Sequence, residues 1–277
     1  MGESGVNIFL LGLLTVGLYV GTVWQLANRL TMDARDKALS LAGSAPFAAA
    51  LVLHALVLWH AIVTDAGLNL GFFNAASLVG WVITTMVLIT AMSRRADSLG
   101  LFVLPLVAVT VVCVMLFPST QTLTADLSIG VQTHVVVSLL GYGLLALAAV
   151  QAMLVWLQDQ ALKKKRLTPV LRGLPPLTSQ ESLLFQLMGA GFFFLSLSLA
   201  SGIVFVDDLF AQHLAHKTVL SCVAWLVFGT LLWGRWRHGW RGHSVIRWSL
   251  IGFAALALSY FGAKLILELL LDRSWSG

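Results

Sequence analysis

The chain has 277 residues, of which 58% are hydrophobic and only 10% are charged, and its formal net charge is +5. A soluble globular domain carries about 25% charged residues, so this composition excludes a water-soluble enzyme, a disordered chain and a small disulfide-bonded secreted module. The composition predicts a polytopic membrane protein, whose architecture is set by the number of apolar spans of ~20 residues.

Eight apolar segments follow one another along the chain. Each is long enough, at about 1.5 Å per residue, to cross the ~30 Å of hydrocarbon in a bilayer as a helix. We therefore predict an all-α fold, a polytopic membrane protein with eight transmembrane helices in a single domain over residues 1–277. The predicted spans are 7–27, 43–64, 71–92, 99–117, 130–157, 186–206, 217–234 and 246–270.

Lysine and arginine gather on alternate loops between these spans. Of the 17 basic residues, 14 follow the first, third, fifth and seventh spans, with a dense run at 163–166. Loops rich in Lys and Arg stay on the cytoplasmic side of a membrane. This distribution predicts that the N-terminus and the C-terminus both lie outside the membrane. The expected partner of the basic loops is the lipid bilayer, and no nucleic acid is expected.

Acidic residues are absent from the middle of every predicted span, because all twelve lie in loops or at span ends. A proton or sodium relay built on Asp or Glu is therefore not expected. Hydrolysis by a carboxylate pair and a metal site of the HExxH type are excluded for the same reason. We predict that the protein is not an enzyme, and a secondary transporter is a weaker alternative.

Histidine is the polar residue type left to act inside the membrane. His54 lies near the middle of the second span and His60 near its outer end, whereas His134 opens the fifth span. His213 and His216 precede the seventh span. Imidazole is a common ligand of haem iron and transition metals, so these five histidines are the candidate cofactor ligands. A hydrogen bond between helices is the alternative role for each of them.

A haem also needs an apolar slot with aromatic walls. Several aromatic side chains lie near the candidate histidines in the sequence, and an aromatic belt at the membrane surface is the other explanation for them. The candidate wall residues are Trp59, Trp81, Phe72, Phe73, Phe205 and Phe210.

The second half of the chain carries short motifs in a fixed order. The run 132–143 (QTHVVVSLLGYG) places His134 before a Gly-Tyr-Gly, and the motifs at 239–242 (GWRG) and 259–262 (SYFG) follow. In order and spacing these motifs resemble the cytochrome c assembly family, which comprises CcsA- and CcmC-type haem-handling proteins and shorter HemX-like proteins. The resemblance covers about 130–265 well. The eight spans and short outer loops suit the HemX-like branch and its small inner-membrane members. The resemblance thus implies a multi-pass protein of the bacterial cytoplasmic (inner) membrane.

The resemblance implies an integral membrane protein that binds or handles haem in support of cytochrome c-type biogenesis. His134 matches the family's candidate for an outer axial ligand, and His54 matches an inner-site histidine, so these two are the implied metal ligands. His60, His213 and His216 are further candidates for cofactor binding. Haem, the bilayer and other cytochrome c assembly or membrane-complex subunits are the implied partners.

The chain departs from the family pattern in its outer segments. The tryptophan-rich signature of the haem handlers is replaced by the sequence at 205–217, and 269–273 lacks the histidine that follows the family's last span. The family's axial pair therefore does not transfer, which leaves open a second ligand from His60, His213 or His216, or a five-coordinate iron. The alternative function is an accessory or scaffold subunit of a transporter or assembly complex, on the same fold without a haem site.

Overall fold

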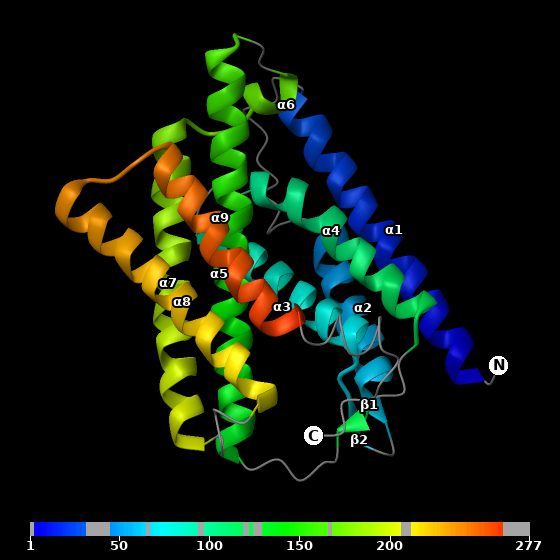
Figure 1. Cartoon of the computed structure of the whole chain (residues 1–277). Helices are drawn as coiled ribbons and strands as arrows, with labels where there is room; N and C mark the ends of the chain where they lie inside the picture. Colours follow the sequence, from blue (N-terminus) through cyan, green and yellow to red (C-terminus); the bar gives the residue numbers. More distant parts are fainter. Residues whose placement is uncertain are drawn as a thin grey trace. The chain divides into compact units, whose positions relative to one another are not determined.

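The structure is a computed structural model (Figure 1). The chain divides into two compact units. Unit 1 comprises residues 1–125 with 167–174, and unit 2 comprises 126–166 with 175–277. Each unit is described by itself. The structure describes residues 3–31, 45–64, 67–93, 97–118, 122–123, 129–165, 168–205 and 212–262.

Unit 1 contains four long helices. Helix α1 contacts both α2 and α4, while α3 contacts α2 and α4. Their facing sides supply a core of apolar residues that includes the fully buried Tyr19, Phe47, Leu99 and Leu104. The helices are α1 (Glu3–Thr31), α2 (Ala45–Ile62), α3 (Phe72–Ser93) and α4 (Asp97–Leu116), and the short α6 (Pro169–Arg172) also belongs to this unit.

A small antiparallel sheet joins two loops of unit 1. Strand β1 (Val63–Thr64) pairs with β2 (Gly67–Asn69), and β2 pairs with β3 (Thr122–Leu123). In this register Leu68 lies opposite Val63 on one side and Leu123 on the other. The sequence predicted the end of the second span at 63–64 and loops at 67–69 and 122–123, because strands of two or three residues are too short to show an alternating pattern.

Unit 2 contains the other four long helices. Helix α5 contacts α7 and α9, and α8 contacts α7 and α9. They are α5 (Ile129–Lys163), α7 (Leu177–Phe205), α8 (Gln212–His238) and α9 (His243–Ala257), which continues as the π-helical turn η2 (Leu258–Gly262).

Eight helices in the described part of the chain are long and apolar enough to cross a membrane. This confirms the predicted number of spans and the nearly all-helical class. Several helices extend past the predicted spans: α7 begins at Leu177 rather than 186, and α5 ends at Lys163 rather than 157. The added turns carry polar residues, which a hydropathy criterion leaves out. The outward termini and the single domain over 1–277 remain predictions.

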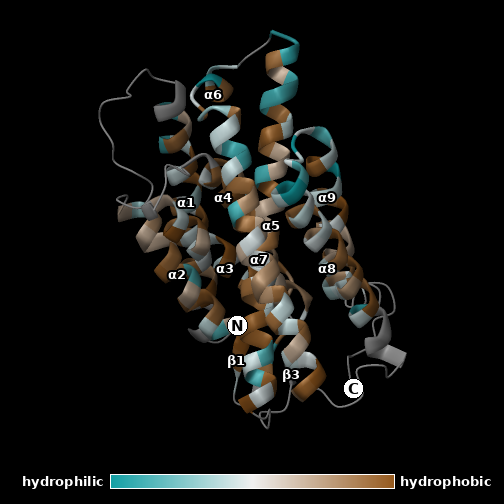
Figure 2. Cartoon of the chain, turned by 90° about the vertical axis from the view of Figure 1, so that its left-hand side faces the viewer, coloured by the Kyte–Doolittle hydropathy of each residue, from teal (hydrophilic) through white to brown (hydrophobic). Residues whose placement is uncertain are grey.

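The outer surfaces of the helices are strongly apolar, as a lipid environment requires. Large hydrophobic side chains such as Leu14, Val109, Phe193 and Leu226 are more than half exposed. Figure 2 shows hydrophobic residues along the middle of the helices and hydrophilic residues at the C-terminal end of α5. The charged end of α5 is therefore the part of this helix that leaves the hydrocarbon.

Glycine allows α5 and α7 to pack closely in unit 2. A Cβ atom at Gly141 would lie 2.9 Å from the backbone nitrogen of Leu195, and one at Gly191 would lie 2.7 Å from Cγ of Leu145. Small residues at an interface let helix backbones approach in a membrane, where no hydrophobic force drives helices together. The Gly-Tyr-Gly motif thus acts first as a packing motif.

We predict that Gly141→Ala lowers the stability of the protein, because the added methyl group meets backbone atoms of α7 that cannot move aside. Overpacking of this kind costs about 1–3 kcal/mol. The thermal unfolding midpoint of the purified protein in mild detergent measures the effect. Gly189→Ala is the matched control, because the nearest atom to its added Cβ, Leu232 Cδ2, would be 3.9 Å away. Equal midpoints for the two variants would contradict the packing argument.

Candidate functional site

His54 lies at the centre of a buried polar cluster in unit 1. It comes from α2 and is 0% exposed. Its Nδ1 is 3.0 Å from the hydroxyl of Tyr19 on α1, and its Nε2 is 2.9 Å from Oγ of Ser77 on α3. The rings of Tyr19 and His54 meet edge to face with their centroids 5.8 Å apart. One histidine thus connects three helices.

The bonds of His54 satisfy a neutral imidazole completely. A neutral ring has one donor nitrogen and one acceptor nitrogen, and a hydroxyl group can serve either of them. A metal bound to either nitrogen would have to replace the bond to Tyr19 or to Ser77. In the geometry described, His54 therefore serves as a link between helices, which is the alternative role that the sequence left open for it.

His134 is placed differently, near the start of α5 in unit 2. It is partly buried, and its Nδ1 is 3.0 Å from Oγ of Ser201 on α7. Two more serines complete the cluster: Ser138 Oγ donates to the carbonyl oxygen of His134 (2.6 Å), and it lies 2.7 Å from Oγ of Ser198. Ser201 Oγ donates to the carbonyl oxygen of Ser198 (3.0 Å).

The hydrogen bonds of this serine cluster favour one tautomer of His134. Each serine has one proton to donate. Ser201 gives its proton to a carbonyl, so its oxygen is left to accept from Nδ1–H of His134. In this arrangement the imidazole carries its proton on Nδ1 and a lone pair on Nε2, and the backbone of Ser198 is a further hydrogen-bond partner of the ring. This is the form in which histidine binds a metal, with the second nitrogen held by a protein group.

The other candidate histidines are not brought into a shared site by the described residues. His60 is exposed in the last turn of α2. His213 and His216 fall in the first turns of α8, and their side chains lie outside the described residues. His54 belongs to unit 1 and His134 to unit 2. Across the described ranges no group of three His, Cys, Asp or Glu residues could hold a metal ion.

The predicted aromatic wall residues have varied surroundings. Trp59 is 64% exposed, and Trp81 donates from Nε1 to the carbonyl oxygen of Leu51. Phe73 meets Phe72 edge to face, with the ring centroids 5.2 Å apart. Phe205 shares unit 2 with His134, and a side chain at Gly130 of α5 would overlap its ring. Phe210 lies outside the described residues.

The family-like motifs of unit 2 meet one another in space. Tyr142 is buried and lies against the rings of Phe253, Tyr260 and Phe261, with centroid distances of 5.7, 5.7 and 5.9 Å. The Gly-Tyr-Gly motif of α5 is thereby joined to the end of α9 and to η2. The first and the last of the three motifs thus meet in one packed aromatic cluster.

The Gly-Trp-Arg-Gly motif forms the turn between α8 and α9. Gly239 and Gly242 have φ angles of +66° and +76°, in the left-handed region that glycine adopts without strain. The ring of Trp240 covers Gly234, where any side chain would overlap it. Both terminal glycines of the motif are thus required by the backbone.

Three buried glutamines form a hydrogen-bonded row that was not predicted from the sequence. Gln151 Nε2 donates to Oε1 of Gln180 (2.8 Å), Gln180 Nε2 donates to Oε1 of Gln158 (2.9 Å), and Gln158 Nε2 donates to the carbonyl oxygen of Pro175 (3.2 Å). The spacing of seven residues on α5 places two of them on one helix face. That spacing was the signal that could have revealed the row.

These features define a nearly all-helical polytopic membrane protein with histidine clusters among its spans. The family model described as "Cytochrome C assembly protein" matches residues 43–271, and the chain belongs to the cytochrome c assembly family. The match reaches further toward the N-terminus than the resemblance over 130–265 and includes His54.

Relatives of known name agree with this family. The chain is 34% identical over 224 residues to "Inner membrane protein YpjD" of Escherichia coli (strain K12), covering 80% of this chain and 84% of the relative. It is 26% identical to "Protein HemX" of Brevibacillus brevis, covering 69% and 72%. It is 23% identical to "Cytochrome c biogenesis protein CcsA" of Gloeobacter violaceus, covering 34% and 29%. No solved structure gives a significant match. With its eight apolar helices, the chain is a multi-pass protein of the bacterial inner membrane.

We predict that His54→Ala destabilises the protein by about 1–3 kcal/mol, because buried polar groups of Tyr19 and Ser77 lose their shared partner. Tyr19→Phe removes only one bond and should cost less, about 0.5–1.5 kcal/mol. Thermal unfolding in detergent measures both changes. His60→Ala provides the control, since this exposed histidine lies on the same helix. A His54→Ala protein as stable as His60→Ala would show that the cluster does not hold the helices together.

Proposed function

We propose that this protein binds and handles haem in support of cytochrome c-type biogenesis, with His134 as its principal ligand. The observation that carries the proposal is the placement of the His134 ring: Ser201 of α7 holds Nδ1, which fixes the ring orientation and leaves Nε2 as the nitrogen suited to bind iron. Family membership supports haem as the cofactor class, and the CcsA relative is by name a cytochrome c biogenesis protein.

The donor chemistry of this site fits haem. Haem supplies an iron centre that accepts imidazole nitrogen as an axial ligand. The role of Ser201 is to fix the orientation and tautomer of the His134 ring. The carbonyl oxygen of Ser198 accepts the hydroxyl proton of Ser201, and Ser138 contacts both the hydroxyl of Ser198 and the carbonyl oxygen of His134. A partner from outside the His134 cluster would complete the coordination, and His213, His216 and His60 remain the predicted candidates for it.

His54 has a separate role in this proposal. Both of its nitrogens have protein partners, so the inner ligand role predicted for it would require the loss of one hydrogen bond. The same observation favours the second candidate function, an accessory or scaffold subunit that retains the family fold without a haem site. Covalent chemistry on haem is assigned to partner proteins in either case, and no enzymatic activity is proposed.

The test is the visible spectrum of protein purified from haem-replete cells. We expect a Soret band with a stoichiometric haem content, reduced at least tenfold in His134→Ala because the iron loses its ligand. Ser201→Ala keeps the ligand but not its orientation, and loss of such a supporting bond costs about 10–100-fold in metal affinity.

The matched control for this experiment is His238→Ala, which replaces an exposed histidine of the same unit. It should retain the haem content of the unaltered protein. A protein that carries no haem under any condition would overturn the haem proposal. In that case the next experiment uses a variant that lacks all five candidate histidines, which are His54, His60, His134, His213 and His216. A partner protein that this variant still retains in mild detergent would support the scaffold function.

We also propose that the His134 end of α5 faces outward, as the distribution of basic loops predicts. Cysteines placed at Ile129 and Lys164, near the two ends of α5, test it after the native Cys113 and Cys222 are changed to alanine. An impermeant maleimide should label the cysteine at position 129 in intact spheroplasts and the one at 164 only after lysis. The reverse pattern would invert the topology.

A further inference from the structure

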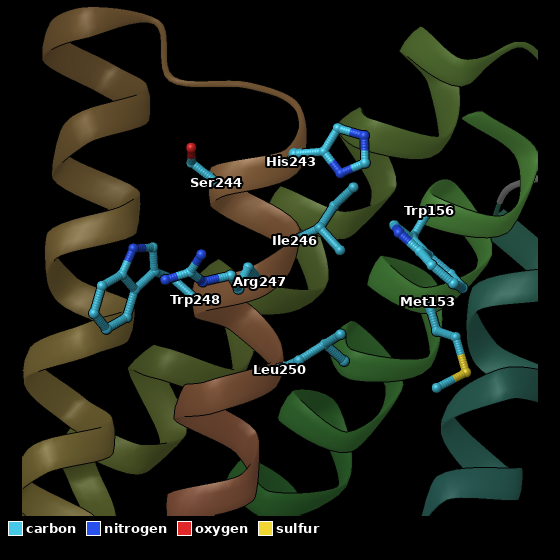
Figure 3. Close-up of a pocket in the computed structure, with 8 residues that line it drawn as sticks. All are labelled: Met153, Trp156, His243, Ser244, Ile246, Arg247, Trp248 and Leu250. Atoms are coloured by element: carbon cyan, nitrogen blue, oxygen red, sulfur yellow. The ribbon is translucent and has the colours of Figure 1, made fainter. Parts of the chain in front are cut away.

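An open cavity of about 600 Å³ lies on unit 2 beside α5 and α9 (Figure 3). Its apolar wall comes from Met153 and Trp156 of α5 and from Ile246 and Leu250 of α9. Trp156 and Met153 are 42% and 51% exposed, so their apolar surfaces are not covered by unit 2 itself. A wall of this composition accepts a hydrocarbon chain.

The polar groups of the cavity all lie near the start of α9. His243, Ser244 and Arg247 line it there, at the first and second turns of the helix. Gly242 precedes the helix and provides no side-chain cap, so the first backbone N–H groups add to a positive end. Arg247 forms no salt bridge with any described acidic residue. The cavity is therefore apolar along its length and cationic at one end.

The charge around this end of unit 2 is strongly positive. Asp159, the acidic group nearest to the cavity, is already bound by Lys163 Nζ (2.7 Å) and His243 Nε2 (2.9 Å). The only other described acidic residue of unit 2 is Glu181. The described basic residues at this end are Lys163, Lys164, Lys165, Arg235, Arg237, Arg241 and Arg247.

A second apolar groove of about 380 Å³ lies between α8 and α9 and shares Trp248 with the cavity. Leu226, Val227 and Leu231 of α8 line it, and Trp240 and Trp248 are its aromatic side. Two apolar spaces thus adjoin the same helix below one cationic end. A molecule with one anionic head and two hydrocarbon chains has this shape and charge.

We propose that the start of α9 is a binding site for an anionic diacyl phospholipid. The phosphate lies against Arg247 and Ser244, one acyl chain runs along Met153, Trp156 and Leu250, and the other enters the groove beside Trp248. Arginine suits the head because its fork of N–H donors matches phosphate oxygens. Tryptophan suits the region where chains meet heads, since its ring has an apolar body and a polar N–H.

The choice of an anionic lipid over a free anion follows from the walls. A free phosphate would need several polar partners around it, whereas most of this cavity is hydrocarbon and indole. A zwitterionic lipid would bring a cationic group toward Arg247 and the surrounding lysines and arginines, where like charges repel. Net negative charge in the head is therefore the property that the site selects.

Native mass spectrometry of the full-length protein, delipidated in mild detergent and titrated with phosphatidylglycerol, tests the site. We expect one tightly bound lipid, with at least fivefold preference over phosphatidylcholine of the same chains. Arg247→Gln should reduce the bound fraction at least fivefold. Arg237→Gln removes the same charge from the end of α8 without lining either space, and it should change binding less than twofold.

A second pair of variants tests the acyl-chain part. Trp248→Ala should weaken lipid binding, while Trp236→Ala, which removes an 84% exposed ring outside both spaces, should not. Thermal unfolding of all four variants confirms that each is folded. Equal binding of the two lipids, equal loss in Arg247→Gln and Arg237→Gln, or displacement of the lipid by millimolar inorganic phosphate would each overturn the proposal.

Discussion

Within a bilayer, a polar side chain away from the surface has to find its hydrogen-bond partner inside the protein, because the hydrocarbon offers none. This requirement organises both units. In unit 1 the imidazole of His54 joins α1, α2 and α3 through Tyr19 and Ser77. In unit 2 the serines around His134 and the glutamine row join α5 to α7. Polar residues here help to determine which helix faces meet.

The same requirement explains what could be predicted from the sequence. The eight spans follow from local hydropathy, and the candidate histidines follow from residue type alone. Their partners do not, since Ser201 is 67 residues from His134 and Tyr19 is 35 residues from His54. The different surroundings of His54, between two hydroxyl groups, and of His134, beside a serine cluster, therefore appeared only when helices distant in sequence were brought together.

Family motifs and candidate ligands have different roles in this protein. Gly141 and Tyr142 pack against α7, α9 and η2, and Gly239 and Gly242 close the α8–α9 turn. The contacts described for these residues are packing contacts between helices and the backbone requirements of a turn. A relative could retain all of them with or without a cofactor, so the state of a single ring, that of His134, is more informative about function than the motif pattern.

The length of α5 has a mechanical consequence. Its 35 residues extend over about 52 Å, well beyond the ~30 Å of hydrocarbon. A helix of this length meets a thinner membrane by tilting further. Its far end is bound to the first residue of α9 through Asp159 and His243, and its length is packed against α7. The helices packed against α5 therefore tilt together with it. The thickness of the surrounding bilayer thus affects the orientation of the whole of unit 2 in the membrane.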